Sequence, residues 1–394
     1  MVAVDMTRSN GDPRSRGSLH AVESDGSPGE FNEYVPVLRS ILEALENTVG
    51  TGNMKIPLFG FGAKLPPSRT CVSHCFSLKG DYFHPQLSGV DEVIEAYRQA
   101  VDTVVVNGPT RFSEIFKVGS EWAQSLVGSS GYLILLVVTD GSMTDFRETV
   151  DILVPMSKLP ASIVIVGVGD SDFSNMDRLD ADKHPLVSDL TGESVYRDIV
   201  QFVRYHDHTE PSSLVEAALA EVPRQLTEYF SEHGVRRTIL ESEPKFLSDQ
   251  MTSLLVTIHN QGYEEDIAER LVNEFGVFSP DPLHVIDVMF FHKRRMALAW
   301  TSDPRDLKQR SLGDRFGVAK QRPKELGAAP QHRLLKSTKQ LGHRDRGTCR
   351  VCFTNHIDTV IQPCGHEIVC IDCSTKIGRL CPLCRNTIDS IIGP

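Results

Sequence analysis

The sequence lacks the features of membrane-spanning and secreted proteins. Its longest apolar runs are about seven residues, as in Tyr132–Val138, whereas a helix that crosses a bilayer needs about twenty. The opening residues Met1–Asp5 contain no basic stretch followed by an apolar one, so they do not resemble a secretory signal. We therefore expect a cytoplasmic protein without a transmembrane segment.

Signatures of hydrolytic and nucleotide-dependent enzymes are missing as well. There is no Gly-x-Ser-x-Gly sequence, no phosphate-binding loop and no persuasive pair of nucleophile and base. Only two of the nine cysteines precede residue 349, and both lie in Cys71-Val72-Ser73-His74-Cys75. That spacing is cramped and no second half-site lies near it, which argues against a metal site there.

Positive charge is scarce overall but concentrated in one segment. The net charge is −11, yet residues 305–350 hold thirteen Lys and Arg against four Asp and Glu, a local +9. With several Pro and Gly and little apolar periodicity, this stretch is typical of a flexible linker. It would also suit nuclear import or contact with anions, but no aromatics interleave with the charges as they do in single-strand nucleic-acid binders.

The C-terminal region is rich in metal ligands. Cysteines and one histidine follow in the order Cys-x2-Cys, eleven residues, Cys-x-His, three residues, Cys-x2-Cys, seven residues, Cys-x2-Cys. The ligands are Cys349, Cys352, Cys364, His366, Cys370, Cys373, Cys381 and Cys384. Such pairs suit tetrahedral zinc, and four half-sites complete two four-ligand sites with no position left for water. The pattern predicts two structural zinc ions.

This interleaved pattern resembles a RING domain. The segment Pro363–His366, the compact gap between Cys373 and Cys381, and the segment Cys381–Arg385 most resemble the short RINGs at the ends of inhibitor-of-apoptosis proteins. The resemblance implies a cross-brace. Cys349, Cys352, Cys370 and Cys373 would hold the first zinc ion. Cys364, His366, Cys381 and Cys384 would hold the second. It also implies ubiquitin-ligase activity, in which the domain orients a ubiquitin-charged conjugating enzyme and does no covalent chemistry itself.

Four further residues match positions that RING domains use for this task. Val351, Pro382 and Leu383 match the apolar positions that dock the conjugating enzyme. Arg385 matches the cation that bridges the enzyme and ubiquitin, a role that suits a multi-donor guanidinium. Many RINGs carry a docking Trp between the sixth and seventh ligands. This chain has no aromatic there, and Ile377 would have to substitute.

The first 230 residues alternate apolar runs with amphipathic segments. We predict strands at Val2–Asp5, Lys55–Gly60, Tyr132–Thr139, Ser162–Gly167 and Ile199–Tyr205. We predict helices at Asp91–Val101, Phe112–Leu126, Phe146–Leu159 and Leu214–Phe230, the last interrupted at Pro223. This alternation is typical of an α/β fold with a doubly wound, mostly parallel sheet whose ligands bind at the carboxyl ends of the strands.

Oxygen-bearing side chains gather at those predicted strand ends. Asp5, Thr7 and Ser9 follow the first strand at alternate positions, which point the same way in an extended segment. Asp140 ends the long third strand, and Thr110 precedes a helix. Carboxylate and hydroxyl oxygens suit Mg²⁺, Mn²⁺ or Ca²⁺. The sequence therefore predicts a divalent-cation site made by these five residues.

The arrangement resembles the metal-ion-dependent adhesion site of von Willebrand factor A domains, and the sequence is similar to the copine branch of that family. The matching segments are Val4–Ser15, Phe59–Ala63, Glu95–Arg98, Gly108–Phe112, Ser157–Pro160 and Arg197–Val203. The resemblance implies a binding module whose metal accepts an Asp or Glu of a partner protein. Copines also carry calcium-dependent lipid-binding domains upstream of this fold. None precedes Val2 here, so we do not carry calcium-triggered membrane binding over.

Three short helices are expected after this domain, at Met251–His259, Glu264–Phe275 and Pro282–Phe291. The Gln261-Gly262-Tyr263 connection resembles the first loop of a ubiquitin-associated domain, which would imply ubiquitin binding. An ordinary helical spacer fits the same pattern. The predicted domains are residues 1–232, copine-like; 233–300, helical; 301–347, basic linker; and 348–394, RING.

Two functions from different classes follow. The first is a RING-type ubiquitin ligase that recruits a protein substrate through the adhesion-type site and transfers ubiquitin to its lysines. The second is a non-catalytic copine-like scaffold whose RING is a zinc-stabilised interaction module, which the missing docking aromatic favours. Ile388, Ile391 and Ile392 could also mediate a homodimer. Nucleic-acid binding through the linker is the weakest of the hypotheses.

Overall fold

The computed structural model describes residues 1–23, 29–49, 54–141, 143–181, 185–234, 244–299, 359–362, 370–374 and 388–392. The chain divides into two compact units, Met1–Met289 and Phe290–Pro394. None of the described helices combines the length and the apolar character that crossing a membrane requires.

A seven-stranded sheet forms the centre of the first unit. Its strand order is β10-β9-β8-β1-β2-β5, with β6 also paired to β2. The strands are β1 (Val2–Asp5), β2 (Lys55–Phe61), β5 (Phe76–Ser77), β6 (Gln86–Ser88), β8 (Leu133–Thr139), β9 (Ala161–Gly167) and β10 (Val200–Arg204). The five long strands pair in parallel, and β5 and β6 run antiparallel to β2. The predicted doubly wound, mostly parallel sheet is therefore confirmed.

The apolar strands are buried on both faces. Alternate residues of a strand face opposite sides. In β8, Leu135 and Val137 join the cluster with α3 and α4, whereas Leu136 and Val138 are buried outside that cluster. Both sides of β8 are therefore shielded from water, which explains why its sequence is continuously apolar and not alternating.

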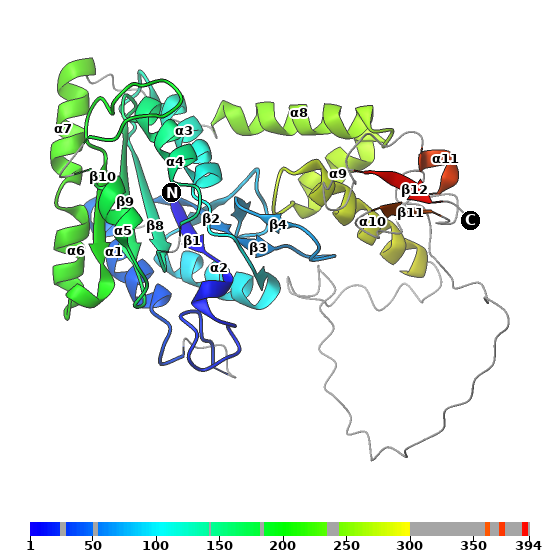
Figure 1. Cartoon of the computed structure of the whole chain (residues 1–394), viewed down its shortest axis with the longest axis horizontal. Coiled ribbons are helices and arrows are strands. Elements are labelled where there is room, and N and C mark those ends of the chain that lie inside the picture. The colour runs from blue at the N-terminus through cyan, green and yellow to red at the C-terminus, as the bar shows by residue number, and fades with distance from the viewer. Residues whose placement is uncertain are drawn as a thin grey trace, which may run out of the picture. The chain divides into compact units, whose positions relative to one another are not determined.

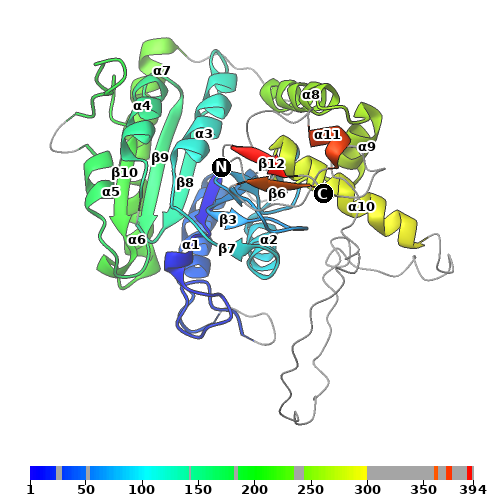
Figure 2. The same cartoon turned by 45° about the vertical axis from the view of Figure 1, so that its right-hand side comes forward.

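Helices cover the sheet in two groups (Figures 1 and 2). One group contains α3 (Ser113–Leu126) and α4 (Phe146–Met156), which pack side by side. The other contains α1 (Tyr34–Val49), α2 (Val90–Thr103) and α6 (Pro211–Leu219), with α1 between the other two. Two more helices, α5 (Ser174–Leu179) and α7 (Val222–His233), contact β10 and β9 respectively.

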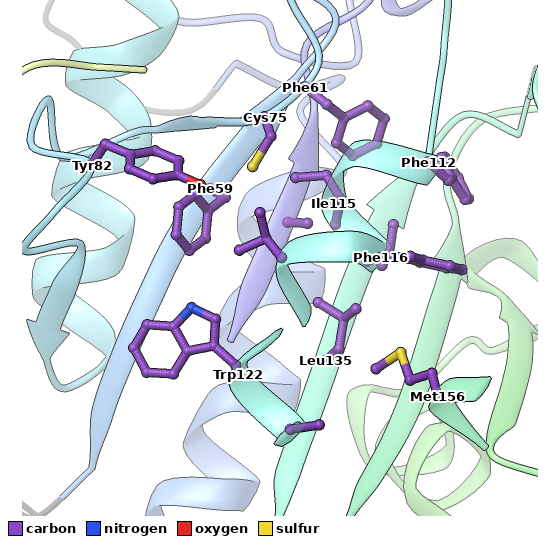
Figure 3. Packing of buried hydrophobic residues seen from close by; sticks show 14 of the residues in the cluster. Phe59, Phe61, Cys75, Tyr82, Phe112, Ile115, Phe116, Trp122, Leu135 and Met156 are labelled. Atoms are coloured by element: carbon purple, nitrogen blue, oxygen red, sulfur yellow. The ribbon is translucent and has the colours of Figure 1, made fainter. Parts of the chain in front are cut away.

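Aromatic side chains fill the space between the sheet and α3. Phe61 of β2 meets Phe112 edge-on, with ring centroids 5.4 Å apart, and Phe112 contacts Phe116 one turn further along the helix (Figure 3). Trp122 is 9% exposed and lies in the same cluster. The aromatic residues at the start of α3 and along it therefore belong to the core.

Three helices after the sheet domain form what we call the helical packet: α8 (Lys245–Asn260), α9 (Glu265–Phe275) and α10 (Pro282–Ala299). It packs on the sheet domain, because Phe246 meets Trp122 edge-on at 5.5 Å and the Gln250 amide donates to Glu121 at 2.8 Å. The α9–α10 connection also bonds to the strand region. The Ser77 and Tyr82 amides donate to the carbonyls of Phe278 and Val277, at 2.8 and 2.7 Å.

Beyond the end of α10, the described part of the second unit contains a short antiparallel pair and one helical turn. Strand β11 (Val360–Gln362) pairs with β12 (Ser390–Ile392), so that Ile361 lies opposite Ile391. The turn α11 (Ile371–Ser374) follows Cys370, whose side chain is buried. Within this pair Ile392 remains 54% exposed and Ile361 is fully buried.

Candidate metal centre

Five predicted oxygen donors lie together at the carboxyl ends of β1 and β8. We call this set the metal edge: Asp5, Thr7, Ser9, Thr110 and Asp140. Strands β1 and β8 are parallel neighbours, so their carboxyl ends meet at one edge of the sheet. Asp5 ends β1, and Asp140 directly follows β8. Topology therefore brings together two carboxylates that are 135 positions apart in the sequence.

Hydrogen bonds connect the donors that follow β1. The Thr7 hydroxyl donates to Asp5 Oδ1 at 2.6 Å, and the Thr7 amide donates to the same oxygen at 2.9 Å. Ser9, in the short 3-10 helix η1 (Arg8–Asn10), has its Oγ 2.9 Å from Thr7 Oγ1. The alternation Asp5, Thr7, Ser9 therefore does converge, as the sequence predicted.

Thr110 reaches the same point from a distant part of the chain. Its hydroxyl lies 3.3 Å from Thr7 Oγ1. The loop that carries it is fixed by Thr144, whose amide and hydroxyl both donate to the Thr110 carbonyl, at 3.0 and 2.8 Å. Asp145 holds the next turn by accepting the amides of Phe112 and Ser113, at 3.0 and 2.9 Å.

The two carboxylates of the metal edge repel each other. Asp5 is fully buried, and Asp140 is 1% exposed. Burial, followed by the charge of Asp140, raises the pKa of Asp5 to about 7, against the opposing effect of the hydrogen bonds from Thr139 and Thr7. Burying two like charges is costly unless a cation compensates them. A divalent ion between these oxygens would remove that cost.

The donor chemistry fits a hard cation. Two carboxylates and three hydroxyls supply only oxygen ligands, which Mg²⁺, Mn²⁺ and Ca²⁺ prefer over the sulfur and nitrogen ligands of zinc. In the part of the chain that the structure describes, no group of three or more His, Cys, Asp and Glu is arranged to hold a metal. The metal edge has only two such residues, and its other three donors are hydroxyls. The residues present therefore fit a magnesium-, manganese- or calcium-type ion.

Two further residues shape the metal edge and were not predicted. Thr139 donates its hydroxyl to Asp5 Oδ2 at 2.6 Å, and so fixes the second oxygen of that carboxylate. Gly62 has a φ of +83°, and a Cβ on it would lie 2.2 Å from Cγ2 of Thr7. The segment Phe59–Ala63 carried the copine resemblance, but sequence alone did not show that its second glycine faces Thr7.

The two predicted zinc sites lie mostly outside the described residues. Cys370 is buried just before α11, and the backbone of Cys373 lies within α11. The other six ligands lie outside the described ranges: Cys349, Cys352, Cys364, His366, Cys381 and Cys384. The same is true of the docking residues Val351, Pro382, Leu383 and Arg385. Their roles remain predictions from the sequence.

Comparison with protein families supports both halves of the sequence prediction. The copine family model matches residues 18–238, which is more than half of the chain. The family model described as a zinc finger of C3HC4 type, the RING finger, matches residues 345–391. This second match implies zinc binding and bears out the recognition of a RING region behind a copine domain.

Comparison with individual proteins gives a similar result for the first part of the chain. Protein BONZAI 1 of Arabidopsis thaliana is 39% identical over 232 residues, which cover 58% of this chain and 39% of the relative. The chain therefore spans about two fifths of that relative's length.

Solved structures were also matched. Manganese-loaded Plasmodium vivax TRAP protein gives a TM-score of 0.34 at 11% identity, covering 54% of this chain and 71% of that one. A von Willebrand factor type A protein from Catenulispora acidiphila gives 0.30 at 12% identity, covering 57% of this chain and 42% of that one.

Proposed function

This chain belongs to the copine family, and on that premise we propose that it is a RING-type ubiquitin ligase. Its copine domain would recruit a protein substrate at the metal edge. Its RING would bind a ubiquitin-charged conjugating enzyme and promote transfer to substrate lysines. The proposal depends on finding two regions in one chain. One matches the copine family and brings the donors of the metal edge together. The other matches the RING finger and contains all eight zinc ligands.

The metal edge would act as the recruiting surface. Asp5, Thr7, Ser9, Thr110 and Asp140 would hold the divalent ion, directly or through water. Only two of these donors are charged, so the bound ion would retain the ability to accept a carboxylate from a partner. The chain's own contribution is to bury the two carboxylates and to fix the hydroxyls by the hydrogen bonds described above.

The RING would supply orientation. Val351, Pro382 and Leu383 would contact the conjugating enzyme, and Arg385 would bridge the enzyme and its ubiquitin. Holding a thioester in a reactive pose accelerates transfer because the reacting groups no longer have to find each other. These assignments rest on the resemblance of the matched region to RING domains.

The direct test is discharge of ubiquitin from a charged conjugating enzyme onto free lysine, with the zinc-loaded full-length protein. We expect Val351→Ala and Arg385→Ala to slow discharge at least about tenfold, since each removes a contact made in the reactive complex. Ile371→Ala, which truncates a 47% exposed side chain in the same region, serves as the matched control and should leave the rate unchanged. Equal rates for the wild type and Val351→Ala would reject this mechanism.

The metal edge is tested separately, by substrate capture. Asp5→Ala should abolish divalent-cation-dependent capture of substrate but leave lysine discharge intact. The alternative, a non-catalytic scaffold, predicts the opposite pattern: metal-dependent capture without discharge by the wild type.

A second binding activity is suggested by the helical packet. The α8–α9 turn, with Gly262 and Tyr263, lines a surface hollow together with His259 and four acidic side chains: Glu264, Glu265, Asp266 and Glu269. Gly262 is exposed, so this turn is available to a partner such as ubiquitin. NMR titration of ubiquitin with the full-length protein tests this. Shifts in ubiquitin signals that Tyr263→Ala abolishes would support it, and no shifts would exclude it.

A further inference from the structure

A buried polar network lies behind the metal edge, in the segment that wraps from η1 to the start of α1. Its centre is His20, which is fully buried. The two rings next to it, Tyr34 and Tyr97, are fully buried as well. The His20 ring stacks on Tyr34 with centroids 4.1 Å apart. Tyr97 lies in the segment Glu95–Arg98 that carries the copine resemblance, but no ligand spacing in the sequence groups it with His20 and Tyr34.

Hydrogen bonds connect His20 to the main chain of a metal-edge residue. Its Nε2 lies 2.7 Å from the carbonyl oxygen of Asp5, and its Nδ1 lies 2.8 Å from the Tyr97 hydroxyl. A carbonyl can only accept, so Nε2 carries the proton and Nδ1 accepts from Tyr97. The Tyr97 oxygen in turn accepts from the Asn32 amide at 3.3 Å. These contacts orient the imidazole in one tautomer, with its donor aimed at Asp5.

A parallel chain of bonds reaches Thr7. Tyr34 donates its hydroxyl to Asn10 Oδ1 at 2.6 Å, and the Asn10 amide lies 3.3 Å from the Thr7 carbonyl and 3.4 Å from the Thr7 hydroxyl. Because Tyr34 also stacks on His20, the two chains form one packed unit behind Asp5 and Thr7. This unit restrains the backbone of both residues through the carbonyls of Asp5 and Thr7.

We propose that His20 is a positioning residue for the metal edge: by holding the Asp5 carbonyl it keeps the Asp5 carboxylate and the Thr7 hydroxyl in the arrangement that a divalent cation requires. The inference rests on the proposed metal site and adds to it the residue that orders it. Groups that orient metal ligands typically contribute about 10- to 100-fold to metal affinity. His20 would act in this way through the main chain of a ligand.

The experiment measures Mn²⁺ binding to the full-length protein after zinc loading, by the electron paramagnetic resonance signal of free Mn²⁺. Asp5→Ala defines the part of the binding that belongs to the metal edge. His20→Phe keeps an aromatic ring for stacking but has no donor, so we expect its Mn²⁺ affinity to fall about tenfold or more. His20→Gln restores an N–H donor and should recover a large part of the loss.

Two controls separate positioning from general destabilisation. Leu254→Ala removes a buried side chain of α8, away from the metal edge, and is compared at a matched loss of Tm. It should leave Mn²⁺ affinity unchanged. Tyr97→Phe removes only the hydroxyl that orients His20. It should weaken binding less than His20→Phe, and it tests the proposal even if His20→Phe does not fold.

The outcomes distinguish this inference from the proposal beneath it. Absence of Asp5-dependent Mn²⁺ binding in the wild type would remove the metal site itself, and this inference with it. Asp5-dependent binding that His20→Phe leaves at wild-type strength would overturn the role of His20 alone. Equal weakening by His20→Gln, His20→Phe and Leu254→Ala would also overturn it, because the effect would then follow stability.

Discussion

Gly62 illustrates how a residue with no side chain determines the geometry of the metal edge. It has a positive φ, and it leaves just enough room for the methyl group of Thr7. Thr7 is itself 2% exposed and bonded to Asp5 and Ser9. Any Cβ at position 62 would push Thr7 away from its bonding partners.

We predict that Gly62→Ala destabilises the fold and weakens divalent-cation binding. The matched control is Gly128→Ala, because Gly128 has a φ of +80° and no atom within 4 Å of the added Cβ. In the control, the free energy of unfolding should fall only by the cost of placing alanine at a positive φ, about 1 kcal/mol. In Gly62→Ala the free energy of unfolding should fall further, and the Mn²⁺ affinity should fall as well. Chemical denaturation and Mn²⁺ titration check the two effects, and equal behaviour of the variants would contradict the contact with Thr7.

A second prediction concerns His206, which bridges two carboxylates. Its Nε2 lies 2.8 Å from Glu33, and its Nδ1 lies 3.1 Å from Asp170. The hydrogen bond to Glu33 is the main cause of a pKa raised above 6.5. Protonated His206 therefore stabilises the fold. This stabilisation is complete at a pH below the pKa of the unfolded state, and it is lost as the pH rises through the pKa of the folded state. Since the side chain is 43% exposed, solvent screens the effect and the change in stability should be small.

NMR titration of the His206 ring measures this directly. Glu33→Gln should return the pKa towards 6.5. Asp170→Asn should lower it less, because the Asp170 side chain is 94% exposed. An unchanged His206 pKa in Glu33→Gln would show that the bridge does not form in solution.

At the scale of single residues, the sequence predicted the metal ligands better than the residues that hold those ligands in place. Asp5, Thr7 and Ser9 are two positions apart, so the direction of their side chains follows from local geometry. No local pattern encodes the contacts of the supporting residues. Gly62 and Thr139 contact residues 55 and 134 positions away, and His20 bonds to the main chain of Asp5. These supporting roles required the fold.

At the scale of elements, the helical packet contacts the sheet domain through the connection between α9 and α10 as well as through its helices. Phe278 is 4% exposed, and its ring lies against Gly80, whose φ is +87°. The carbonyls of Val277 and Phe278 accept the amides of Tyr82 and Ser77, which lie after and within β5. The α9–α10 connection therefore extends the hydrogen bonding beyond β5.

We predict that Phe278→Ala loosens this contact. Truncating a buried Phe typically costs about 3–5 kcal/mol, and the Ser77 and Tyr82 amides should then exchange with solvent faster. Hydrogen exchange followed by mass spectrometry or NMR measures both effects. Ile267→Ala on α9 is the control, because that side chain is 36% exposed and its loss should leave these amides protected. Unchanged exchange in Phe278→Ala would contradict the contact.

The predicted elements differ from the observed ones mainly where tertiary pairing decides. The five parallel strands were predicted to within two residues because their apolar runs are long. Strands β5 and β6 have two and three residues and exist only through pairing with β2, so no local signal marks them. The single helix predicted at Leu214–Phe230 is two helices, with Pro223 in the first turn of α7, where a missing N–H costs nothing. Helix α1 was not predicted.

For the molecule as a whole, the important division lies between the sheet domain with its helical packet and the C-terminal unit. The first compact unit runs to Met289, past the end of the copine match at residue 238. The basic segment predicted as a linker, residues 301–347, supplies many sites for trypsin. Helices α8 and α9 should therefore remain with the sheet domain when the chain is cut.

Limited trypsin digestion with intact-mass analysis tests this arrangement. We expect a stable fragment that begins at the N-terminus and ends after residue 289, because the helical packet is bonded to β5 and α3. A stable fragment that ends near residue 240 would contradict it, since the packet would then be separable from the sheet. The Phe278→Ala variant should shift the digestion towards that shorter product.

The bonds that Ser77 and Tyr82 make to the α9–α10 connection also bear on how the copine domain should be prepared. A fragment that stopped at residue 238 would leave those two amides facing water. Unpaired strand borders of this kind invite pairing between molecules and aggregation. Recombinant versions that continue through α10 should stay monodisperse at concentrations at which shorter versions precipitate.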